Sequence, residues 1–449
     1  MKEEDSGVAK GIVTFVILFA GSILICYPIS LLRDVSAFAL FIEFIVISFL
    51  ISANVVLIKR VKYIWIYLLL AVLRFGLVCY QSTYGDLAMA GGDTGVFHDF
   101  ASNILYSAAN FFELLVPADI LENRGDFYER MIAVVYYFFG DKTQYIYFTS
   151  FMFAEIVFRY IYKSALIIVG DEDVSAKTSL LFYIWPMEVV FSIAYLKEMQ
   201  IQAVFAISIY CFIKFSKGYG LRYIVLAMLF AFLSAGTHSG MIAVVVSYFL
   251  ILGLYDVKLK AFRFNILVTA VVFLVFTALV STPVWETMSG RFSNISSLDD
   301  IALIRGSIVG STDYIAAPQS GAGVILQTPL RFVLFILSPL PWHITSMGTL
   351  IALALDGMLR YWVLYRLVKL LKIWRQIQSE YKTILVSFFI IWIFTDLVFS
   401  WGTNNYGTAM RHRLKIFPME VLMFYAVYKV SKEQLNLGKA SDKHNYTGV

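Results

Sequence analysis

The segment Ala90–Phe100 carries the side chains best suited to chemistry in this chain. It places Asp93, His98 and Asp99 after two glycines, directly behind a long apolar run. A carboxylate can act as a general base toward a hydroxyl group, and a histidine can transfer a proton. Asp93 within Gly-Gly-Asp-Thr-Gly is also compatible with a plain turn, because Asp and Gly favour turn conformations. The neighbouring His98 and Asp99 favour the interpretation as a site.

A second candidate group is basic and lies near the C-terminal end. Arg411, His412, Arg413 and Lys415 stand where a polar segment passes into an apolar run. The planar guanidinium of arginine binds phosphate oxygens in bidentate fashion, so the group fits a phosphate or pyrophosphate. Contact with lipid headgroups is the alternative, because basic side chains at helix ends often extend to them.

Other polar side chains are weaker candidates. Glu198 and His238 each lie in a turn between two apolar runs, and Arg305 lies in a long polar segment. Glu198 is also compatible with a solvated turn charge, and His238 with a capping residue. Glu155 and Arg159 stand four residues apart inside one apolar run, where mutual neutralisation on one helix face lowers the cost of burial. We interpret that pair as structural.

The composition defines the class of protein. Hydrophobic residues make up 60% and charged residues 15% of the chain, and the mean hydropathy is +0.76. A soluble fold does not hide so much apolar surface, which predicts an all-α polytopic membrane protein. Its three cysteines all lie in apolar runs and indicate neither a disulfide nor a metal framework. The net charge of +5 resides in short loops and does not indicate nucleic-acid binding.

Apolar runs long enough to cross ~30 Å of hydrocarbon suggest roughly twelve spans, within a range of about 11–13. They cover residues 11–32, 36–58, 63–80, 143–169, 179–194, 200–215, 223–235, 240–254, 264–281, 347–371, 384–401 and 414–428. The apolar segment 330–342 is interpreted as a re-entrant or interfacial helix broken at Pro339 and Pro341. The alternative is that it spans and a neighbouring short run does not.

The distribution of lysine and arginine predicts the topology. Basic short loops at 59–62, 214–222, 258–263 and 366–382 indicate the cytoplasmic side, which places both termini there. Residues 1–430 are predicted to form one transmembrane domain, with outer loops 81–142 and 282–345, and residues 431–449 a polar cytoplasmic tail. Residues 97–109 are predicted to form a helix in the membrane interface. Every candidate site residue then falls on the outer side.

These residues carry a resemblance to a known class of enzymes. Asp93 in the first outer loop, Trp185-Pro186-Met187-Glu188, Leu196-Lys197-Glu198 and the closing Asn404–Arg413 segment look like the GT-C class of membrane glycosyltransferases. Within it, the chain most resembles the O-antigen and exopolysaccharide polymerases of bacterial surface-glycan loci. It lacks the Trp-Trp-Asp signature of oligosaccharyltransferases, and Asp93 is not part of a paired Asp-Asp or Asp-Glu. The acceptor and a divalent-metal requirement therefore stay open.

The resemblance implies a multi-pass enzyme of the bacterial cytoplasmic membrane with an extracytoplasmic active site. It would transfer a sugar or oligosaccharide repeat unit from a polyprenyl (pyro)phosphate carrier to a glycan acceptor. Asp93 is the preferred base, Glu198 the second carboxylate, and Arg411 and Arg413 the phosphate binders. The expected substrate-binding residues are His98, Asp99, His238, Arg305, Arg411, His412, Arg413 and Lys415. No cofactor is assigned, and a divalent metal stays open.

Two other functions remain as alternatives. A lipid-linked oligosaccharide flippase, or another polytopic transporter, would have a similar number of spans and intramembrane charges. Transporters usually bind their substrates near the bilayer midplane and often contain internal repeats, whereas no repeat is visible here and the polar groups gather on one face. A membrane scaffold is the third alternative, and it leaves the outer basic group unexplained.

Overall fold

The computed structural model describes residues 2–85, 93–115, 127–256, 261–262, 266–281, 313, 315–316, 320–344, 347–433 and 435. These residues are almost entirely helical, as the composition predicted. The only strands among them are β1 (Tyr255–Asp256) and β2 (Ala261–Phe262), which pair antiparallel.

The helices of the N-terminal half are α1 (Lys2–Arg33), α2 (Ala37–Leu57), α3 (Val61–Tyr84), α4 (Thr94–Ser107), α5 (Phe111–Leu115), α6 (Phe127–Phe139), α7 (Gln144–Val169), α8 (Glu172–Ile184), α9 (Pro186–Ser192) and α10 (Glu198–Ser216). Those of the C-terminal half are α11 (Arg222–Thr237), η1 (Ser239–Met241), α12 (Ile242–Leu254), α13 (Ile266–Val280), α16 (Gly321–Leu337), η3 (Pro341–His343), α17 (Met347–Ala352), η4 (Leu353–Gly357), α18 (Met358–Ile373), η5 (Trp374–Gln376), α19 (Ser379–Trp401), α20 (Tyr406–Leu414), α21 (Phe417–Val421) and η6 (Leu422–Val427).

Five helices in the described ranges are long and apolar enough to cross a membrane. They are Gly7–Arg33, Ala37–Leu57, Val61–Tyr84, Glu198–Ser216 and Ser379–Trp401. Shorter apolar helices cover Arg222–Thr237, Ser239–Leu254, Thr269–Ala278 and Gly321–Leu337. Helices of this kind satisfy their own backbone hydrogen bonds in lipid, which is why they suit a bilayer. The chain is a helical membrane protein, and the number of twelve spans stays a prediction.

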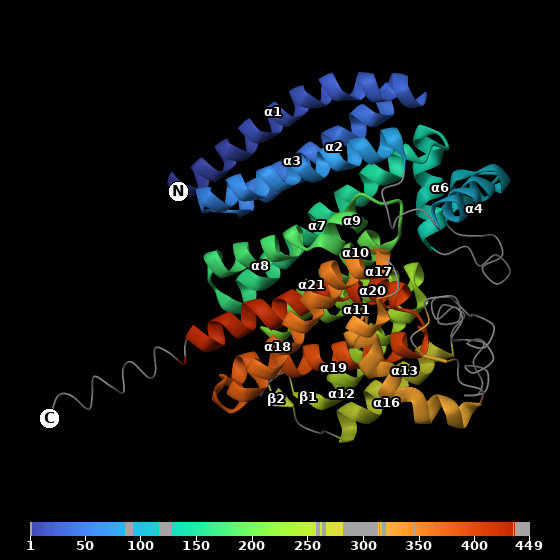
Figure 1. The fold of residues 1–449 in the computed structure, drawn as a ribbon. Helices are drawn as coiled ribbons and strands as arrows, with labels where there is room; N and C mark the ends of the chain where they lie inside the picture. Colours follow the sequence, from blue (N-terminus) through green and yellow to red (C-terminus); the bar gives the residue numbers. More distant parts are fainter. Residues whose placement is uncertain are drawn as a thin grey trace.

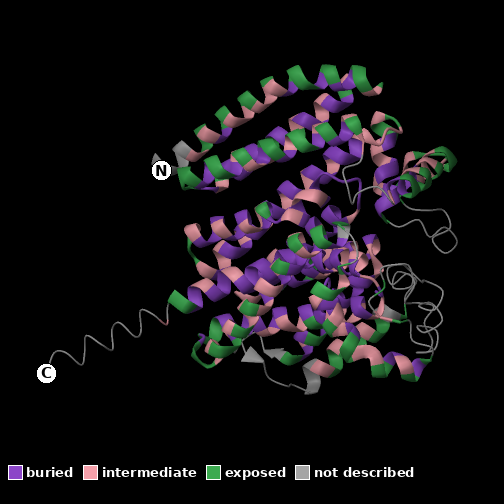
Figure 2. Ribbon diagram, viewed as in Figure 1, coloured by how far each residue is buried: buried purple, intermediate pink, exposed green. Residues whose placement is uncertain are grey.

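The helices stack in layers. In Figure 1, α1, α2 and α3 lie together at one edge, and α7 packs between them and the layer of α8 and α10. Apolar side chains on the outer faces of α1 and α3 are exposed, among them Leu24, Leu31, Trp65 and Leu69 (Figure 2). Such large apolar surfaces are unusual facing water but are expected facing lipid.

The two ends of the stack differ. The first turn of α1 and the end of the last C-terminal helix lie at one end, at the left of Figure 1, whereas α4 and α6 lie at the opposite end. This separation agrees with a topology that has both termini on one side and the first polar segment on the other. Which end faces the cytoplasm stays a prediction.

Several runs that the sequence predicts as continuous spans are interrupted. α8 ends before Pro186, which begins α9, because proline cannot donate the backbone hydrogen bond that continues a helix. The break predicted at Pro339 and Pro341 is present: α16 ends at Leu337, and Pro341 begins the short η3 turn. The run 347–371 contains the π-helical turn η4, and the last run contains the π-helical turn η6. The predicted segment 330–342 thus begins inside a helix that starts at Gly321.

The predicted pairing of Glu155 with Arg159 is wrong. The hydroxyl groups of Tyr67 and Tyr183 donate to the Glu155 carboxylate. Arg159 instead donates to the backbone carbonyl of Ala53, 2.9 Å away. Both side chains lie on α7, and each bonds to neighbouring helices instead of to the other: Arg159 to α2, and Glu155 to α3 and α8 and, through Asn54 Nδ2 at 2.9 Å, also to α2. Packing between helices rather than spacing along one helix decides their partners.

Candidate functional site

One cluster brings together three predicted site residues from distant parts of the chain. Arg411 Nη1 donates to Asp93 Oδ2 at 2.6 Å, and Arg411 Nε donates to Glu198 Oε1 at 2.9 Å. The three residues belong to α20, to the start of α4 and to the start of α10. The folded chain therefore places one guanidinium between two carboxylates at the point where these helices meet.

Helix termini position the two carboxylates. Glu198 is the first residue of α10, where the positive end of the helix dipole favours a negative charge. Asp93 is the N-cap residue of α4, and its carbonyl accepts the Phe97 N–H at 3.0 Å. Its side chain makes no capping hydrogen bond, unlike most N-cap Asp residues. The Asp93 carboxylate is turned toward Arg411 instead of toward its own helix.

Arg411 lies in the last turn of α20, and this helix fixes its position in the cluster. α20 begins at the N-cap Asn405, whose side chain accepts the Thr408 N–H at 2.8 Å. Burial alone would lower the pKa of the Arg411 guanidinium, but the neighbouring carboxylates of Glu198 and Asp93 raise this pKa above its ordinary value. Arg411 therefore carries a permanent positive charge.

The members of the cluster differ in exposure, which separates their roles. The Glu198 side chain is 1% exposed, Arg411 31% and Asp93 46%. Glu198 is the buried member of the cluster, and a ligand that approaches from solvent contacts the partly exposed Arg411 and Asp93 first.

Aromatic contacts anchor α4, and with it Asp93, against the rest of the protein. Phe97 is buried, and Lys197 Nζ lies 5.5 Å from its ring centroid. His98 Nδ1 lies 2.9 Å from the Tyr136 hydroxyl, which is 3.1 Å from the hydroxyl of Tyr195. His98 therefore connects α4 to α6 and to the segment that leads into Glu198. Its predicted neighbour Asp99 is exposed on α4.

His238 and His412 form an aromatic group close to Arg411. Their ring centroids are 5.0 Å apart, and the His412 ring lies 4.7 Å from that of Phe399. His412 Nδ1 is 2.9 Å from Thr403 Oγ1. Lys415 is buried, with its Nζ 5.2 Å from the Phe399 ring centroid. These three sequence-predicted residues share one locality beside the cluster.

His238 is electrostatically constrained by its surroundings. Burial, and then the positive charges of Lys415, Lys197 and Arg411, hold the pKa of His238 well below its usual range. Its Nδ1 accepts the backbone N–H of Gly240 at 3.2 Å. His238 is therefore a neutral imidazole at physiological pH, with the proton on Nε2.

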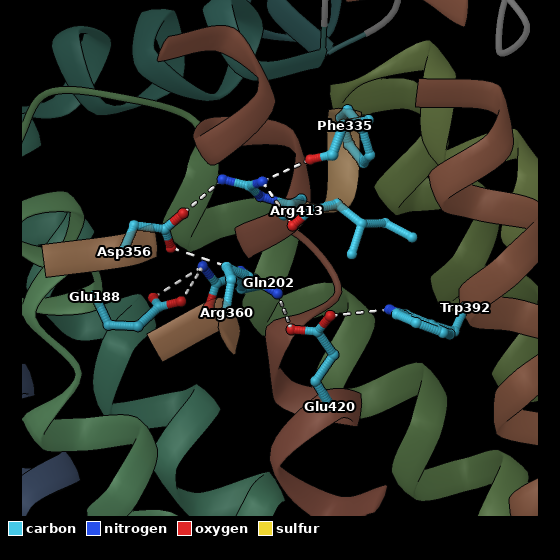
Figure 3. Close-up of polar contacts among 9 residues, drawn as sticks. Glu188, Gln202, Phe335, Asp356, Arg360, Trp392, Arg413 and Glu420 are labelled. Atoms are coloured by element: carbon cyan, nitrogen blue, oxygen red, sulfur yellow. Dashed lines mark hydrogen bonds and ion pairs between the residues drawn. The ribbon is translucent and has the colours of Figure 1, made fainter. Parts of the chain in front are cut away.

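Arg413 lies apart from Arg411, in a buried network (Figure 3). Its Nη1 donates to the carbonyls of Phe335 and Ile336, at 2.5 and 3.0 Å, and its Nη2 donates to Asp356 Oδ2 at 2.5 Å. The carbonyls belong to the last turn of α16, which has no further turn to donate to them. The sequence predicted that Arg411 and Arg413 both bind the phosphate or pyrophosphate of the donor, whereas in the structure they have different partners.

The same network contains charged residues that the sequence analysis missed. Arg360 Nη1 donates to Glu420 Oε2 at 2.5 Å, and Trp392 Nε1 donates to Glu420 Oε1 at 2.9 Å. A separate pair lies beside this network: Gln202 donates to both oxygens of Glu188, at 3.0 and 2.9 Å (Figure 3). Arg360 and Glu420 are isolated charges inside apolar runs, and this pattern alone could have identified them in the sequence as candidates for buried ion pairs.

The remaining predictions concern Arg305 and metal ions. Arg305 lies outside the described residues. Within the ranges that the structure describes, no group of three or more His, Cys, Asp or Glu side chains is arranged to hold a metal ion.

No protein-family model, curated protein or solved structure matches this chain. The fold and the composition define it as a helical membrane protein, and the ion-paired cluster of Asp93, Glu198 and Arg411 is its candidate functional site.

Proposed function

We propose that this protein is a glycosyltransferase of the bacterial cytoplasmic membrane that uses a polyprenyl (pyro)phosphate-linked sugar or oligosaccharide as donor. The observation that carries the proposal is the position of Arg411 between the accessible Asp93 and the buried Glu198. A carboxylate and an arginine at one end of the helix stack are the two groups that such a transfer needs. The acceptor is a glycan on the extracytoplasmic side.

The cluster suits the bond changes of the reaction. An acceptor hydroxyl attacks C1 of the donor sugar while the bond between C1 and the phosphate oxygen breaks. Asp93 takes the proton of the hydroxyl, which raises the nucleophilicity of its oxygen as C1 gains oxocarbenium character. Arg411 stabilises the negative charge that grows on the departing polyprenyl (pyro)phosphate. Glu198 holds the guanidinium in place from below.

The residues around the cluster complete the proposed site. Lys415 adds a second positive charge near Arg411, which suits a pyrophosphate with more than one charge. The neutral His238 and its neighbour His412 present aromatic rings, which can stack on the apolar face of a sugar. His98 fixes α4 through Tyr136 and so fixes Asp93. Asp99, exposed on the same helix, is placed to meet an acceptor glycan.

One observation favours the alternative of a lipid-linked oligosaccharide flippase or another transporter. Helix breaks and π-helical turns lie beside the buried charges of Asp356, Arg360 and Glu420 (Figure 3). Interrupted helices and intramembrane charges are typical of transporters. Against it, the accessible charges of the candidate site, Arg411 and Asp93, lie where the ends of α20, α4 and α10 meet, whereas a transporter would bind its substrate near the bilayer midplane.

The glycans of a strain without this protein test the proposal. A polymerase predicts that single repeat units accumulate on an outer-leaflet carrier, and a single-sugar transferase predicts a polymer without one sugar. A flippase predicts carrier-linked units that stay on the cytoplasmic side. Complementation with Asp93→Asn should fail, because the loss of a general base costs ~10²–10⁴ in rate.

The matched control is Asp141→Asn, which removes a carboxylate that accepts a hydrogen bond from Tyr106 at 2.6 Å and does not contact Arg411. It should restore the glycan fully at the same protein level as Asp93→Asn. Polymer near the wild-type level from Asp93→Asn would remove Asp93 from the mechanism.

A further inference from the structure

The hydrogen bonds of Arg411 limit how this residue can bind a phosphate. A guanidinium binds an anion in bidentate fashion either through Nη1 and Nη2 or through Nε and Nη2. In the structure Nη1 donates to Asp93 and Nε donates to Glu198. Either bidentate arrangement therefore shares a nitrogen with a carboxylate of the chain itself.

The two carboxylates are not equally easy to displace. Glu198 is buried at the first turn of α10 and cannot leave Arg411 without losing its partner in a dry environment. Asp93 is nearly half exposed, and water can solvate its carboxylate when the ion pair breaks. A phosphate that approaches from the exposed side also repels Asp93, since both are negatively charged.

The local structure of α4 does not depend on the contact between Asp93 and Arg411. The Asp93 side chain makes no capping bond to the helix. The helix is held instead by buried Phe97 and by the contact of His98 with Tyr136. A rotation of the Asp93 side chain can therefore exchange its partner while α4 stays in place.

We propose that Asp93 and the donor phosphate exchange at Arg411: the phosphate takes the Nη1 that Asp93 holds, and the released carboxylate becomes free to accept the proton of the acceptor. This inference rests on the proposed function and adds an order to it, because the base is released only after the donor has bound. Until then the bond from Arg411 Nη1 to Oδ2 holds the Asp93 carboxylate in its orientation toward Arg411. The exchange couples activation of the acceptor to the presence of a donor.

The exchange makes a prediction that a simple binding role for Asp93 does not make. Asp93→Asn removes the competitor for Arg411 and the repelling charge, so a phosphate should bind more tightly although turnover is lost. Breaking a partly exposed ion pair of this kind corresponds to roughly a threefold to fivefold gain in affinity. Asp141→Asn should leave the affinity unchanged, and Asp93→Asn combined with Arg411→Met should lose the gain.

The test measures binding to the full-length protein in nanodiscs with two probes. Inorganic pyrophosphate is titrated from solution, and polyprenyl phosphate is incorporated in the nanodisc, in each case with neutral lipid or with added phosphatidylglycerol. A gain for both probes shows that the phosphate group is sufficient, and a gain for polyprenyl phosphate alone shows that the carrier chain contributes. Either result supports the exchange.

Three results would overturn it. Equal or weaker binding by Asp93→Asn would show that Asp93 does not compete with the phosphate, and if turnover is still lost, the proposed function would stand without the exchange. A gain in affinity that appears only with added phosphatidylglycerol, and is absent in neutral lipid for both probes, would assign Arg411 to bulk lipid headgroups. A gain that persists without Arg411 would place the phosphate elsewhere. If Asp93→Asn does not yield folded protein, Asp93→Ser serves as the second variant.

Discussion

Arg413 and Arg411 stand two positions apart on α20, and replacing each by lysine should change a different property of the protein, its stability or its phosphate binding. Arg413→Lys should destabilise the protein and leave phosphate binding intact in the protein that remains folded. Arg411→Lys should weaken phosphate binding with little change in stability. The reason is that Arg413 makes its bonds inside a buried network, whereas Arg411 is partly exposed.

The size of the Arg413 effect follows from its contacts. It bonds to two carbonyls of α16 and to the buried Asp356, with distances of 2.5, 3.0 and 2.5 Å. A single ammonium cannot reproduce this fork, and losing one bond that involves a charged group costs ~1.5–3 kcal/mol. Arg413→Met removes the charge as well and should cost ~3–5 kcal/mol, because Asp356 loses a buried partner. Arg360 Nε, 3.6 Å from Asp356 Oδ1, partly offsets that loss.

The Tm of the purified variants in detergent, together with their affinity for pyrophosphate, checks this prediction. Arg413→Lys should lower the Tm clearly, and Arg413→Met should lower it further. At position 411 a lysine keeps a positive charge beside the buried Glu198, and the loss of the partly exposed pair with Asp93 corresponds to at most ~1 kcal/mol. An unchanged Tm in Arg413→Lys, combined with a tenfold loss of phosphate affinity, would refute this reasoning and return Arg413 to the phosphate-binding role that the sequence alone suggested.

Three further predictions concern charge and topology. The folded pKa of His238 lies below the unfolded value of 6.5, so the stability from its neutral form is present above pH 6.5 and is lost as the pH falls. The loss is at most ~1.4 kcal/mol between pH 7.5 and pH 5.5, because only the unfolded histidine takes up a proton over this interval while the folded ring stays neutral. Tm measurements should show a weaker pH dependence for His238→Asn, and an equal dependence would contradict the prediction. Arg411→Lys should reduce turnover about tenfold or more, because the ammonium loses the planar fork; unchanged kinetics would indicate a lipid contact. In a background without the three native cysteines, a cysteine at the exposed Ser320 should react with an impermeant maleimide and one at the exposed Ser379 should be protected; the reverse pattern would place Asp93 in the cytoplasm.

The features that depend on composition and on single residues were predictable from the sequence. The apolar content indicated a helical membrane protein, and the predicted break at Pro339 and Pro341 follows from the missing N–H of proline. The same reasoning applied to Pro186 would have divided the run 179–194, which was predicted as one span. Asp93 and Arg411 were recognised as polar groups on one face, and they are in contact in the structure.

Partners inside the membrane were not predictable in this way. The sequence treated Arg411 and Arg413 as one group, but residues two apart on a helix do not face each other, so their partners differ. Glu155 and Arg159 have the right spacing for a pair on one helix, and yet each finds a better partner on a neighbouring helix. Such choices depend on which helices are adjacent, and the hydrophobic pattern of a single sequence does not contain this information.

The most direct test of the central claim is transfer by the purified protein in nanodiscs, with a polyprenyl-pyrophosphate-linked oligosaccharide as donor and a matching glycan as acceptor. The account predicts that the wild type and Asp141→Asn lengthen the glycan and release polyprenyl pyrophosphate in equal amounts, that Asp93→Asn does neither although it is folded, and that Arg411→Lys does both about tenfold more slowly or worse. Wild-type protein that moves the intact donor across the bilayer without forming a glycosidic bond would contradict the claim and identify a transporter.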